Sequence, residues 1–315
     1  MKVTRGYLGE SVRPYPVATI GNFDGHHVGH RALLRTVVET ARKARGTAMV
    51  LTFDPHPVKI LAAHVDLRFL TSPEEKLARF EAAGIDEVVL LEFDEAFAGL
   101  SPEAFAERVL AHGLGLKELF VGEHFAFGHK RAGKIADLVA LGGRFGFVVH
   151  PLSPVMVDGG VVSSTRIRQL IQAGNVAQAA HLLGRPYAMT GVVSPGARRG
   201  QALGWPTANL PVPADRVVPP DGVYATVTIV NRQQHDSVAY IGTRPTFDAG
   251  ERRLEVYLLD SDQDLYGQWI TVDFVERVRG DMQFAGGEAL SRQIGLDVES
   301  ARTMLRRHHE TIGEP

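Results

Sequence analysis

The stretch Pro16–Leu34, PVATIGNFDGHHVGHRALL, decides how the first half of the chain folds. An apolar run ends there in glycines, one carboxylate and three histidines, and a helical pattern begins at about His30. A strand, a tight polar loop and a helix in this order are typical of a parallel α/β sheet. The histidines at 26, 27 and 30 could bind a metal, contact a phosphate or simply cap the helix.

The same alternation of short apolar runs and helical patterns continues to about Leu183. Strands are expected at PVATI, AMVLTF, EVVLLEF, KELFVG and FGFVVHP, and helices at about 30–45, 72–84, 101–113, 135–141 and 165–183. In the second helix Ser72 is the expected cap, with Pro73 at the first helical position and Glu75 completing a capping box. Because the apolar runs are continuous, they predict a doubly wound parallel sheet covered on both faces.

After Leu183 the composition and the periodicity change. Glycine and proline become frequent, and apolar residues alternate with a period of two in the runs YATVTIV, RLEVYLL and WITVDFV. One further helix is expected near Glu288–His308. This pattern indicates an antiparallel barrel or sandwich with a C-terminal helix. The domains are therefore expected to span 1–184 and 185–315, and a length of 315 residues agrees with two domains.

The composition narrows the class of protein. The hydrophobic fraction is 44% and the formal net charge is -2, so nothing favours binding to nucleic acid or a membrane surface. The sequence has no cysteine, which excludes disulfides, zinc–thiolate sites and a cysteine nucleophile. No apolar run approaches the length of a membrane span, and the first residues lack an apolar signal core. A cytoplasmic location is therefore expected.

Polar, glycine-rich or acidic residues follow each of the five expected strands. They are GNFDGHHVGH, DPHP, Asp94, GEHFAFG and PLSPVMVDGGVVSSTRIR. Ligands bind beyond the carboxyl ends of the strands in open parallel sheets. Five such segments at one edge therefore predict a crevice of nucleotide size.

The first of these loops carries the clearest chemical signal. Gly21, Gly25 and Gly29 would let backbone amides approach an anion, and His27 and His30 would share one face of the helix start. Two imidazoles there could stabilise charge on a transferred phosphate. A zinc site would need a third ligand. From the spacing alone, phosphate chemistry and the metal or capping interpretations both stay open.

Two other stretches suggest phosphate binding less directly. GHKRAGK, at 128–134, has the spacing of a P-loop, but Ile135 stands where the magnesium-binding hydroxyl belongs. SSTRIR, at 163–168, puts hydroxyls, free amides and guanidinium groups at a helix start, which suits a polyphosphate. Taken alone, that stretch is better explained by an ordinary cap with solvated arginines.

The second half offers two candidate catalytic elements. In GQALGWPTANLPVP, at 200–213, Thr207 and Asn209 would face the same side of an extended segment. Their oxygens suit Mg²⁺, although a turn with an asparagine cap would look alike. In RLEVYLL, alternation puts Glu255 on the face opposite Leu254 and Val256. It could be a general base or a solvent-facing strand residue.

The motifs together resemble a known family. GNFDGHHVGH, TFDPHP, VGEHFAFG and SSTRIR, followed by GARRGQALGWPTANL, DGVYA, IGTRPTF, LEVYLLD, DLYGQ and RGDMQF, resemble the bacterial bifunctional riboflavin kinase/FMN adenylyltransferases, or FAD synthetases. The resemblance implies a Rossmann-like nucleotidyltransferase domain followed by a Greek-key riboflavin kinase barrel. It implies that riboflavin is phosphorylated by ATP to FMN, and that a second ATP adenylylates FMN to FAD and pyrophosphate. ADP is then the other product and Mg²⁺ the cofactor, while a weak homo-oligomer stays open.

The resemblance also assigns roles to individual residues. Catalysis would fall to His27, His30 and Glu255. In the first domain ATP would be bound by Gly21, Asn22, Phe23, Asp24, Gly29, Ser163, Ser164, Thr165 and Arg168, and the flavin by Asp54, Pro55, His56 and Phe125. In the second, Gly200, Thr207 and Asn209 would bind ATP, Thr207 and Asn209 the metal, and Arg279 and Phe284 the flavin. His26, His124 and Tyr257 depart from the family pattern. A transferase of other specificity, such as a cytidylyltransferase, and a non-catalytic flavin-binding protein are the competing interpretations.

Overall fold

The computed structural model describes residues 1–8, 12–194, 204–243, 252–261 and 263–313. The chain divides into two compact units, Met1–Ser164 and Thr165–Pro315. This division falls in the first turn of helix α7 (Ser164–Gln172), so α7 and α8 (Val176–Leu183) are grouped with the second unit. The domain boundary expected at 184/185 stays a prediction.

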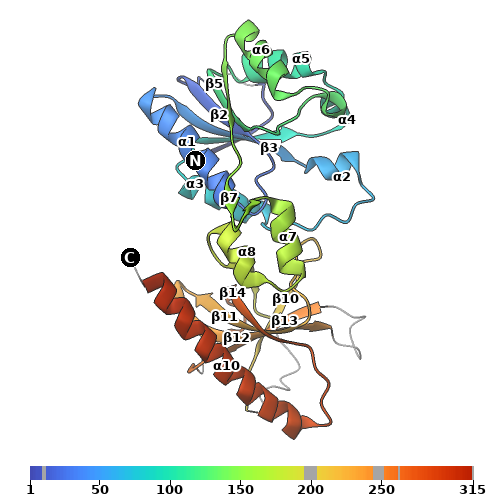
Figure 1. Ribbon diagram of the computed structural model, residues 1–315, viewed down its shortest axis with the longest axis vertical. Coiled ribbons are helices and arrows are strands. Elements are labelled where there is room, and N and C mark those ends of the chain that lie inside the picture. The colour runs from blue at the N-terminus through green and yellow to red at the C-terminus, as the bar shows by residue number, and fades with distance from the viewer. Residues whose placement is uncertain (9–11, 195–203, 244–251, 262, 314–315) are drawn as a thin grey trace. The chain divides into compact units, whose positions relative to one another are not determined.

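The first unit is built on a six-stranded sheet in which every pair of neighbours is parallel (Figure 1). The strand order is β1-β4-β3-β2-β5-β6. The strands are β1 (Lys2–Arg5), β2 (Pro16–Ile20), β3 (Thr47–Asp54), β4 (Glu87–Glu92), β5 (Glu118–Gly122) and β6 (Val148–Leu152). The order runs one way from β2 to β4 and the other way from β5 to β6, so the topological switch lies between β2 and β5. The prediction of a doubly wound parallel sheet is confirmed.

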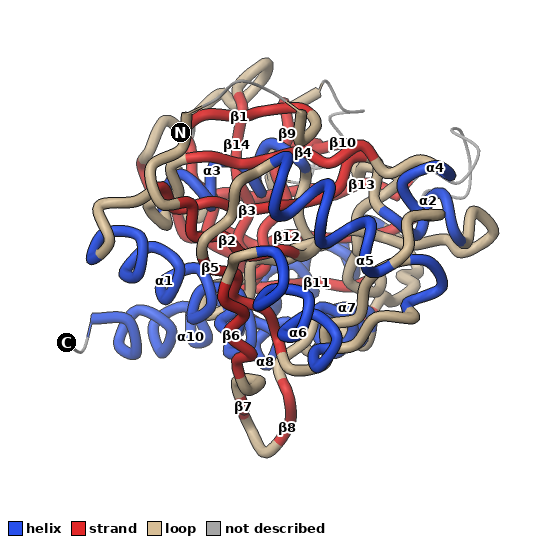
Figure 2. Tube along the Cα trace, turned by 90° about the horizontal axis from the view of Figure 1, so that it is seen from above, coloured by secondary structure: helices blue, strands red, loops and turns tan. Residues whose placement is uncertain are grey.

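Helices cover both faces of this sheet because successive strand residues alternate between two hydrophobic clusters. Val17 packs with Leu34 of α1 and Phe80 of α3, whereas Ala18 packs with Val109 on the opposite face. The helices are α1 (Val28–Lys43), α2 (Pro57–Leu61), α3 (Pro73–Ala82), α4 (Glu95–Ala98), α5 (Pro102–Ala104), η1 (Phe105–Gly113), η2 (His129–Arg131) and α6 (Ile135–Phe145). A hairpin of β7 (Met156–Val157) and β8 (Gly160–Val161) extends outward after β6 (Figure 2).

Local signals predicted most of these elements. The capping box is present, with Ser72 Oγ accepting from the Glu75 amide and the Glu75 carboxylate accepting from the Ser72 amide. The single helix expected over 165–183 is wrong, because Gly174, at φ +83°, separates α7 from α8. The helix expected over 101–113 widens into the π-helical η1 after Ala104. The edge strand β1 was missed, since its sequence KVTR is too polar for a core strand.

The second unit is an antiparallel sheet in the order β10-β13-β12-β11-β14-β9 (Figure 1). The strands are β9 (Tyr187–Val192), β10 (Ala208–Pro211), β11 (Gly222–Val230), β12 (Gln233–Thr243), β13 (Arg252–Leu258) and β14 (Trp269–Gly280). The run β14-β11-β12-β13 has the spatial order of a Greek key. One bridge, between Ser194 and Asn209, brings the two ends of the sheet together. The predicted Greek-key barrel is confirmed.

The C-terminal helix α10 (Gly287–Gly313) packs on the outside of this sheet. Val298, Ala301 and Leu305 of the helix join Val223 and Ala225 of β11 in one cluster. The helix expected over 288–308 is therefore confirmed with longer ends. Strand β12 was missed because its first half, QQHD, is polar.

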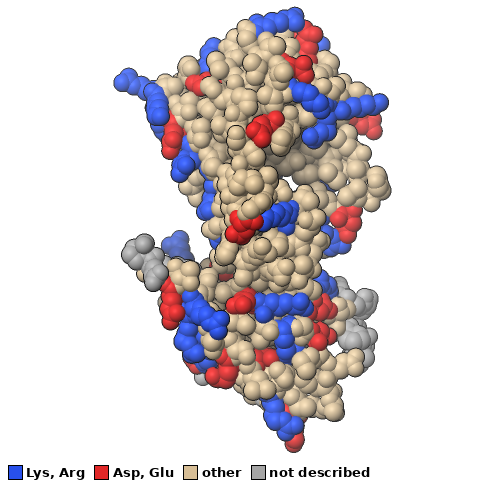
Figure 3. Space-filling model, in the orientation of Figure 1, with Lys and Arg blue, Asp and Glu red and all other residues tan. Residues whose placement is uncertain are grey.

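The distribution of charged residues and the character of the helices are the features that the composition predicts. Lysine and arginine are interspersed with aspartate and glutamate on the face that Figure 3 shows. Within the described parts of the chain, no helix combines the length and apolar character that a membrane span requires.

Candidate active sites

The loop that carries the histidines lies at the switch point of the parallel sheet. Strand β2 ends at Ile20 and β5 at Gly122, and β2 and β5 are neighbours. Residues 21–27, called the histidine loop below, follow β2 directly and end at the cap of α1. A ligand is expected at this point of an open α/β sheet. The histidine loop therefore lies at the carboxyl edge of the sheet, as the sequence predicts.

The histidine loop is clamped by Asp24. Its carboxylate accepts hydrogen bonds from the backbone amides of Leu70 and Thr71 at 3.0–3.1 Å and from the Thr71 hydroxyl at 3.1 Å. The Gly25 amide donates back to that hydroxyl, and the Ser164 hydroxyl donates to the Asp24 carbonyl at 2.8 Å. With a side chain only 5% exposed, Asp24 is placed to fix the loop rather than to face a ligand.

The loop turns sharply because Phe23, Gly25 and His26 all have positive φ angles. Left-handed conformations are costly for residues with a side chain and tend to cluster at functional sites. His26 is buried, with its ring 6.0 Å from that of Phe80 in an edge-to-face arrangement. The histidine that departs from the family pattern thus packs beneath the loop.

His27 and His30 lie together at the start of α1. Their rings are stacked, with centroids 3.5 Å apart, and His27 Nδ1 accepts the His30 amide at 3.2 Å. His27 is the N-cap, so the capping interpretation is correct for this residue. A Cβ added at Gly29 would lie 3.2 Å from the His27 ring, so the glycine leaves room for that ring. The pair lies where the helix dipole favours an anion.

The pKa of the His30 side chain is perturbed. Burial, together with the nearby His27 and His26, holds the pKa of His30 well below its ordinary value of 6.5. The ring is therefore neutral at pH 7. Its Nδ1 is buried and has no hydrogen-bond partner among the residues that the structure describes. In the same residues no group of three metal-binding side chains is arranged to hold a metal ion, so the metal interpretation gains no support.

The other side of the same sheet edge is aromatic. Phe53 at the end of β3 contacts Phe93 after β4, with ring centroids 5.4 Å apart. Phe125 and Phe127, after β5, are stacked at 6.0 Å. Phe127 belongs to the hydrophobic cluster on the face opposite α1 and α3, and Phe53 and Phe125 pack against it. The edge therefore has a polar histidine side and a flat aromatic side.

The remaining predicted residues of the first unit are more scattered. Asp54 is exposed and pairs with Arg5 at 3.0 Å, and Pro55 follows it through a cis peptide bond. His56 caps α2, where its Nδ1 accepts the Val58 amide. Asn22 is exposed in the histidine loop, whereas Phe23 is buried below it.

The segment at 163–168 spans the start of α7. Ser163 and Ser164 close the first unit, while Thr165 and Arg168 belong to the second. Ser164 is engaged with the Asp24 carbonyl, and Thr165 is exposed in the first helical turn. The stretch with P-loop spacing at 128–134 contains the short helix η2 and ends at Lys134, the cap of α6. It does not form a strand–loop–helix phosphate site.

In the barrel, strand register brings three of the predicted residues onto one line. Asn209 lies opposite Glu255, Glu255 opposite Tyr240, Tyr240 opposite Val223 and Val223 opposite Arg279. Directly opposed residues share a face, and neighbouring strands lie about 4.8 Å apart. We call these five residues the cross-strand line. The half-buried Glu255 alternates with the buried Leu254 and Val256, as predicted.

One end of the cross-strand line holds an unsatisfied oxygen. Asn209 is 4% exposed, and its Oδ1 has no hydrogen-bond partner among the described residues. Thr207 lies two residues earlier and is half-buried. Trp205 fixes this segment, because its indole N–H donates to Ser291 of α10 and its ring contacts Tyr257 edge-on. Gly200 lies outside the described residues.

Arg279, at the other end, is held by α10. Its guanidinium donates to the Asp297 carboxylate at 2.8–3.1 Å, in a pair whose side chains are 17% and 4% exposed. Gln293 donates to the same carboxylate, and Phe284 lies under the guanidinium at 5.7 Å. Arg279 therefore joins α10 to β14, and Phe284 is positioned by it.

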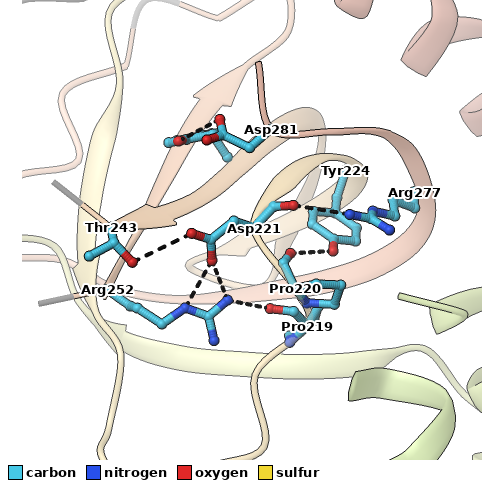
Figure 4. A network of polar contacts seen from close by, with 9 residues as sticks. Pro219, Pro220, Asp221, Tyr224, Thr243, Arg252, Arg277 and Asp281 are labelled. Atoms are coloured by element: carbon cyan, nitrogen blue, oxygen red, sulfur yellow. Dashed lines mark hydrogen bonds and ion pairs between the residues drawn. The ribbon is translucent and has the colours of Figure 1, made fainter. Parts of the chain in front are cut away.

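A second network ties together the strand ends next to this line (Figure 4). The Asp221 carboxylate accepts Arg252 at 2.5–3.0 Å and Thr243 at 3.4 Å, while the Asp221 carbonyl accepts Arg277. Tyr240 donates to Asp281 at 3.0 Å. The ends of β11, β12 and β13 are thus held in register beside Glu255.

Sequence reasoning missed three residues at these sites. They are Phe53 on β3, Lys76 on α3 and Tyr240 on β12. From the sequence, β3 and α3 were considered only as structural elements, and β12 was not predicted. Phe53 directly precedes the DPHP loop, which was a usable signal. Tyr240 reaches Glu255 only through strand pairing, and Lys76 reaches the sheet edge only through helix packing.

Comparisons with known proteins assign both halves of the chain to described families. The family model described as FAD synthetase matches residues 11–166, and the one described as riboflavin kinase matches 183–305. The bifunctional riboflavin kinase/FMN adenylyltransferase of Escherichia coli K12 is 39% identical over 306 residues, covering 96% of this chain and 97% of its own. The bifunctional riboflavin kinase/FMN adenylyltransferase of Bacillus subtilis 168 is 34% identical over 292 residues, covering 90% of this chain and 91% of its own.

A solved structure is similar over both units. It is described as a macrolide-efflux protein from Streptococcus pneumoniae, with a TM-score of 0.86 and 32% identity over 96% of this chain and 99% of its own. Its description names another activity, whereas the two family models and the curated relatives agree with one another.

Proposed function

Because the chain belongs to the family of bifunctional riboflavin kinase/FMN adenylyltransferases, we propose that its two reactions use the two sites described above. The enzyme converts riboflavin to FMN and FMN to FAD with ATP. Adenylyl transfer is assigned to the switch point of the parallel sheet, and phosphorylation to the cross-strand line of the barrel. We propose that the two domains span residues 1–184 and 185–315. The end of the first family match at 166 and the start of the second at 183 support a boundary in this region.

Adenylyl transfer needs hydrogen-bond donors around the reacting phosphorus rather than a nucleophilic side chain. A phosphate oxygen of FMN attacks the α-phosphorus of ATP, the new P–O–P link forms, and the bond to the β-phosphate oxygen breaks to release pyrophosphate. His27, His30 and the first amides of α1 stabilise the charge on the oxygens around phosphorus. Gly21, Asn22, Gly29, Ser163 and Ser164, all in the first unit, would complete the phosphate site. The observation that carries this assignment is the stacked pair at the switch point, with an unsatisfied His30 Nδ1.

The aromatic side of the same edge suits the flat ring system of a flavin. The partly buried Phe53 and Phe125 offer ring surfaces against which an isoalloxazine ring can stack. Asp54 and His56 flank that side from the loop after β3. The division into a charged half and an aromatic half matches the two chemical halves of FMN.

Phosphorylation requires a base beside a bound ATP. Glu255 would accept the proton of the ribityl hydroxyl as its oxygen attacks the γ-phosphorus, and ADP would leave. Thr207 and Asn209 would hold Mg²⁺, because both offer neutral oxygens and Asn209 Oδ1 is buried without a partner among the described residues. When bound, the cation neutralises charge on the phosphates. Phe284 and the Arg279 segment would contact the flavin. The opposition of Asn209 and Glu255 in the register carries the assignment.

The proposal is tested by following products over time. With riboflavin, ATP and Mg²⁺, FMN should rise first and then fall as FAD and pyrophosphate appear. Removing the divalent cation with EDTA should stop FMN formation, and adding Mg²⁺ back should restore it. Formation of FMN in the presence of EDTA would contradict the metal assignment. FAD formation with CTP in place of ATP would contradict the nucleotide specificity.

A further inference from the structure

Lys76 brings a positive charge to the carboxyl edge of the parallel sheet from an unexpected direction. It lies on α3, which packs on the same face of the sheet as α1. Its Nζ lies 3.5 Å from the Asn22 carbonyl oxygen of the histidine loop and 3.4 Å from the Thr52 hydroxyl of β3. The ammonium group is therefore located between the ends of β2 and β3, beside the proposed phosphate site.

The charge of Lys76 has no anionic partner among the described residues. Both of its hydrogen bonds go to neutral oxygens and are longer than the usual 2.7–3.2 Å. The carboxylate of Asp24 is engaged by Leu70 and Thr71, and that of Asp54 by Arg5. Burial lowers the pKa of Lys76, and the more distant Asp24 and Asp54 oppose this shift. A half-buried cation without an ion pair is costly to maintain, so it suggests a ligand that completes it.

We propose that Lys76 binds a phosphate group of the substrates during adenylyl transfer, as a further substrate-contacting residue beside His27 and His30. A phosphate oxygen is the anion that suits this edge of the sheet, since Lys76 contacts the loop that leads into the N-terminus of α1 and the histidine pair. The long contacts with Asn22 and Thr52 would then hold the side chain until substrate arrives. The phosphate could be that of FMN or one of the ATP chain. This inference rests on the site assignment above.

The test compares three variants of the full chain by steady-state kinetics of FMN adenylylation. Lys76→Met removes both charge and hydrogen bonding. Lys76→Gln removes the charge but keeps a donor for Asn22 and Thr52. Lys43→Met is the matched control, because Lys43 is exposed at the far end of α1, roughly 24 Å along the helix from its start. Near-UV circular dichroism and thermal unfolding of the same samples report whether the first unit is folded, and riboflavin phosphorylation is the activity control for the second unit.

Both Lys76 variants should lose about 10- to 100-fold in kcat/KM for adenylylation, the loss expected for one charge-assisted hydrogen bond. The kinase activity and the Lys43→Met variant should stay within twofold of the unaltered enzyme. A rise in KM for ATP would assign the contact to the triphosphate, and a rise in KM for FMN would assign it to the flavin phosphate.

Two results would overturn the inference. One is full adenylylation by Lys76→Gln together with a loss in Lys76→Met, because Lys76 would then only support the loop. The other is activity within twofold in both variants. Failure of the unaltered enzyme to make any FAD would instead refute the site and function on which the inference rests.

Discussion

The histidine loop of the first unit is held by hydrogen bonds to segments distant in sequence, whereas the cross-strand line of the barrel is aligned by strand register. Asp24 reaches Leu70 and Thr71 to fix the loop. In the barrel, Asn209 and Glu255 face each other because β10 and β13 pair. A loop site can lose its geometry when a single clamp is cut, while a strand site should keep it until the sheet itself is disturbed.

The largest effect is expected from removing the histidines. In the double variant His27→Ala, His30→Ala, FAD formation from supplied FMN should fall by about 10⁴-fold, because each donor to a charged transition state is worth about 10²–10³. Riboflavin phosphorylation should be unchanged. Product chromatography with FMN and with riboflavin as separate substrates measures both. A parallel loss of phosphorylation in a folded protein would argue against separate sites.

Glu255→Gln should produce the complementary loss in the barrel. Phosphorylation should fall about 10³-fold, within the range for a general base, because the amide cannot accept the hydroxyl proton. Register should keep the amide in place, so riboflavin binding should persist. Fluorescence titration with riboflavin and a kinase assay give the two readouts, and unchanged phosphorylation would exclude Glu255 as the base.

Asp297→Ala should destabilise the barrel by about 3–5 kcal/mol, because it leaves Arg279 partly buried without its partner. Asp260→Ala is the matched control: its pair with Arg302 is formed by a carboxylate that is 72% exposed. That variant should cost much less stability, because an ion pair formed by an exposed carboxylate contributes little. Denaturant unfolding followed by tryptophan fluorescence compares them. Equal losses in both variants would contradict the role of α10 as an anchor for Arg279.

Asp24→Asn tests the clamp on the histidine loop. The amide keeps one acceptor oxygen but turns an NH₂ group toward the donors of Leu70 and Thr71, at a cost of about 1–3 kcal/mol. Adenylylation should fall about tenfold while phosphorylation stays constant. Unchanged adenylylation in this variant would show that the Asp24 clamp does not control the geometry of the histidine loop.

The smallest expected effect concerns pH. The pKa of His30 is lowered in the folded protein, so the unfolded chain binds this proton first as pH falls through about 6.5. The stabilising contribution is therefore present above that pH and lost below it. Between pH 8 and 5.5, Tm should decrease less steeply in His30→Asn than in the unaltered protein. Identical slopes in the two proteins would contradict the burial of the His30 ring.

The sequence predicted the features that depend on neighbouring residues and missed those that depend on distant ones. The capping box at Ser72 and the position of the histidine loop follow from local patterns, and both are present. Asp24 and Arg279 were expected to bind ligands, yet their visible contacts are structural and link segments 46 and 18 residues apart. No local pattern contains such a pairing, nor the approach of Lys76 to Asn22.

The central claim is that the enzyme has two independent sites, one in each unit. Mixing the double histidine variant with Glu255→Gln tests it most directly, because each protein should supply the reaction that the other lacks. With riboflavin, ATP and Mg²⁺, neither variant alone should form FAD, and the mixture should form FMN and then FAD. A mixture that makes FMN without FAD, or neither product, would contradict the claim.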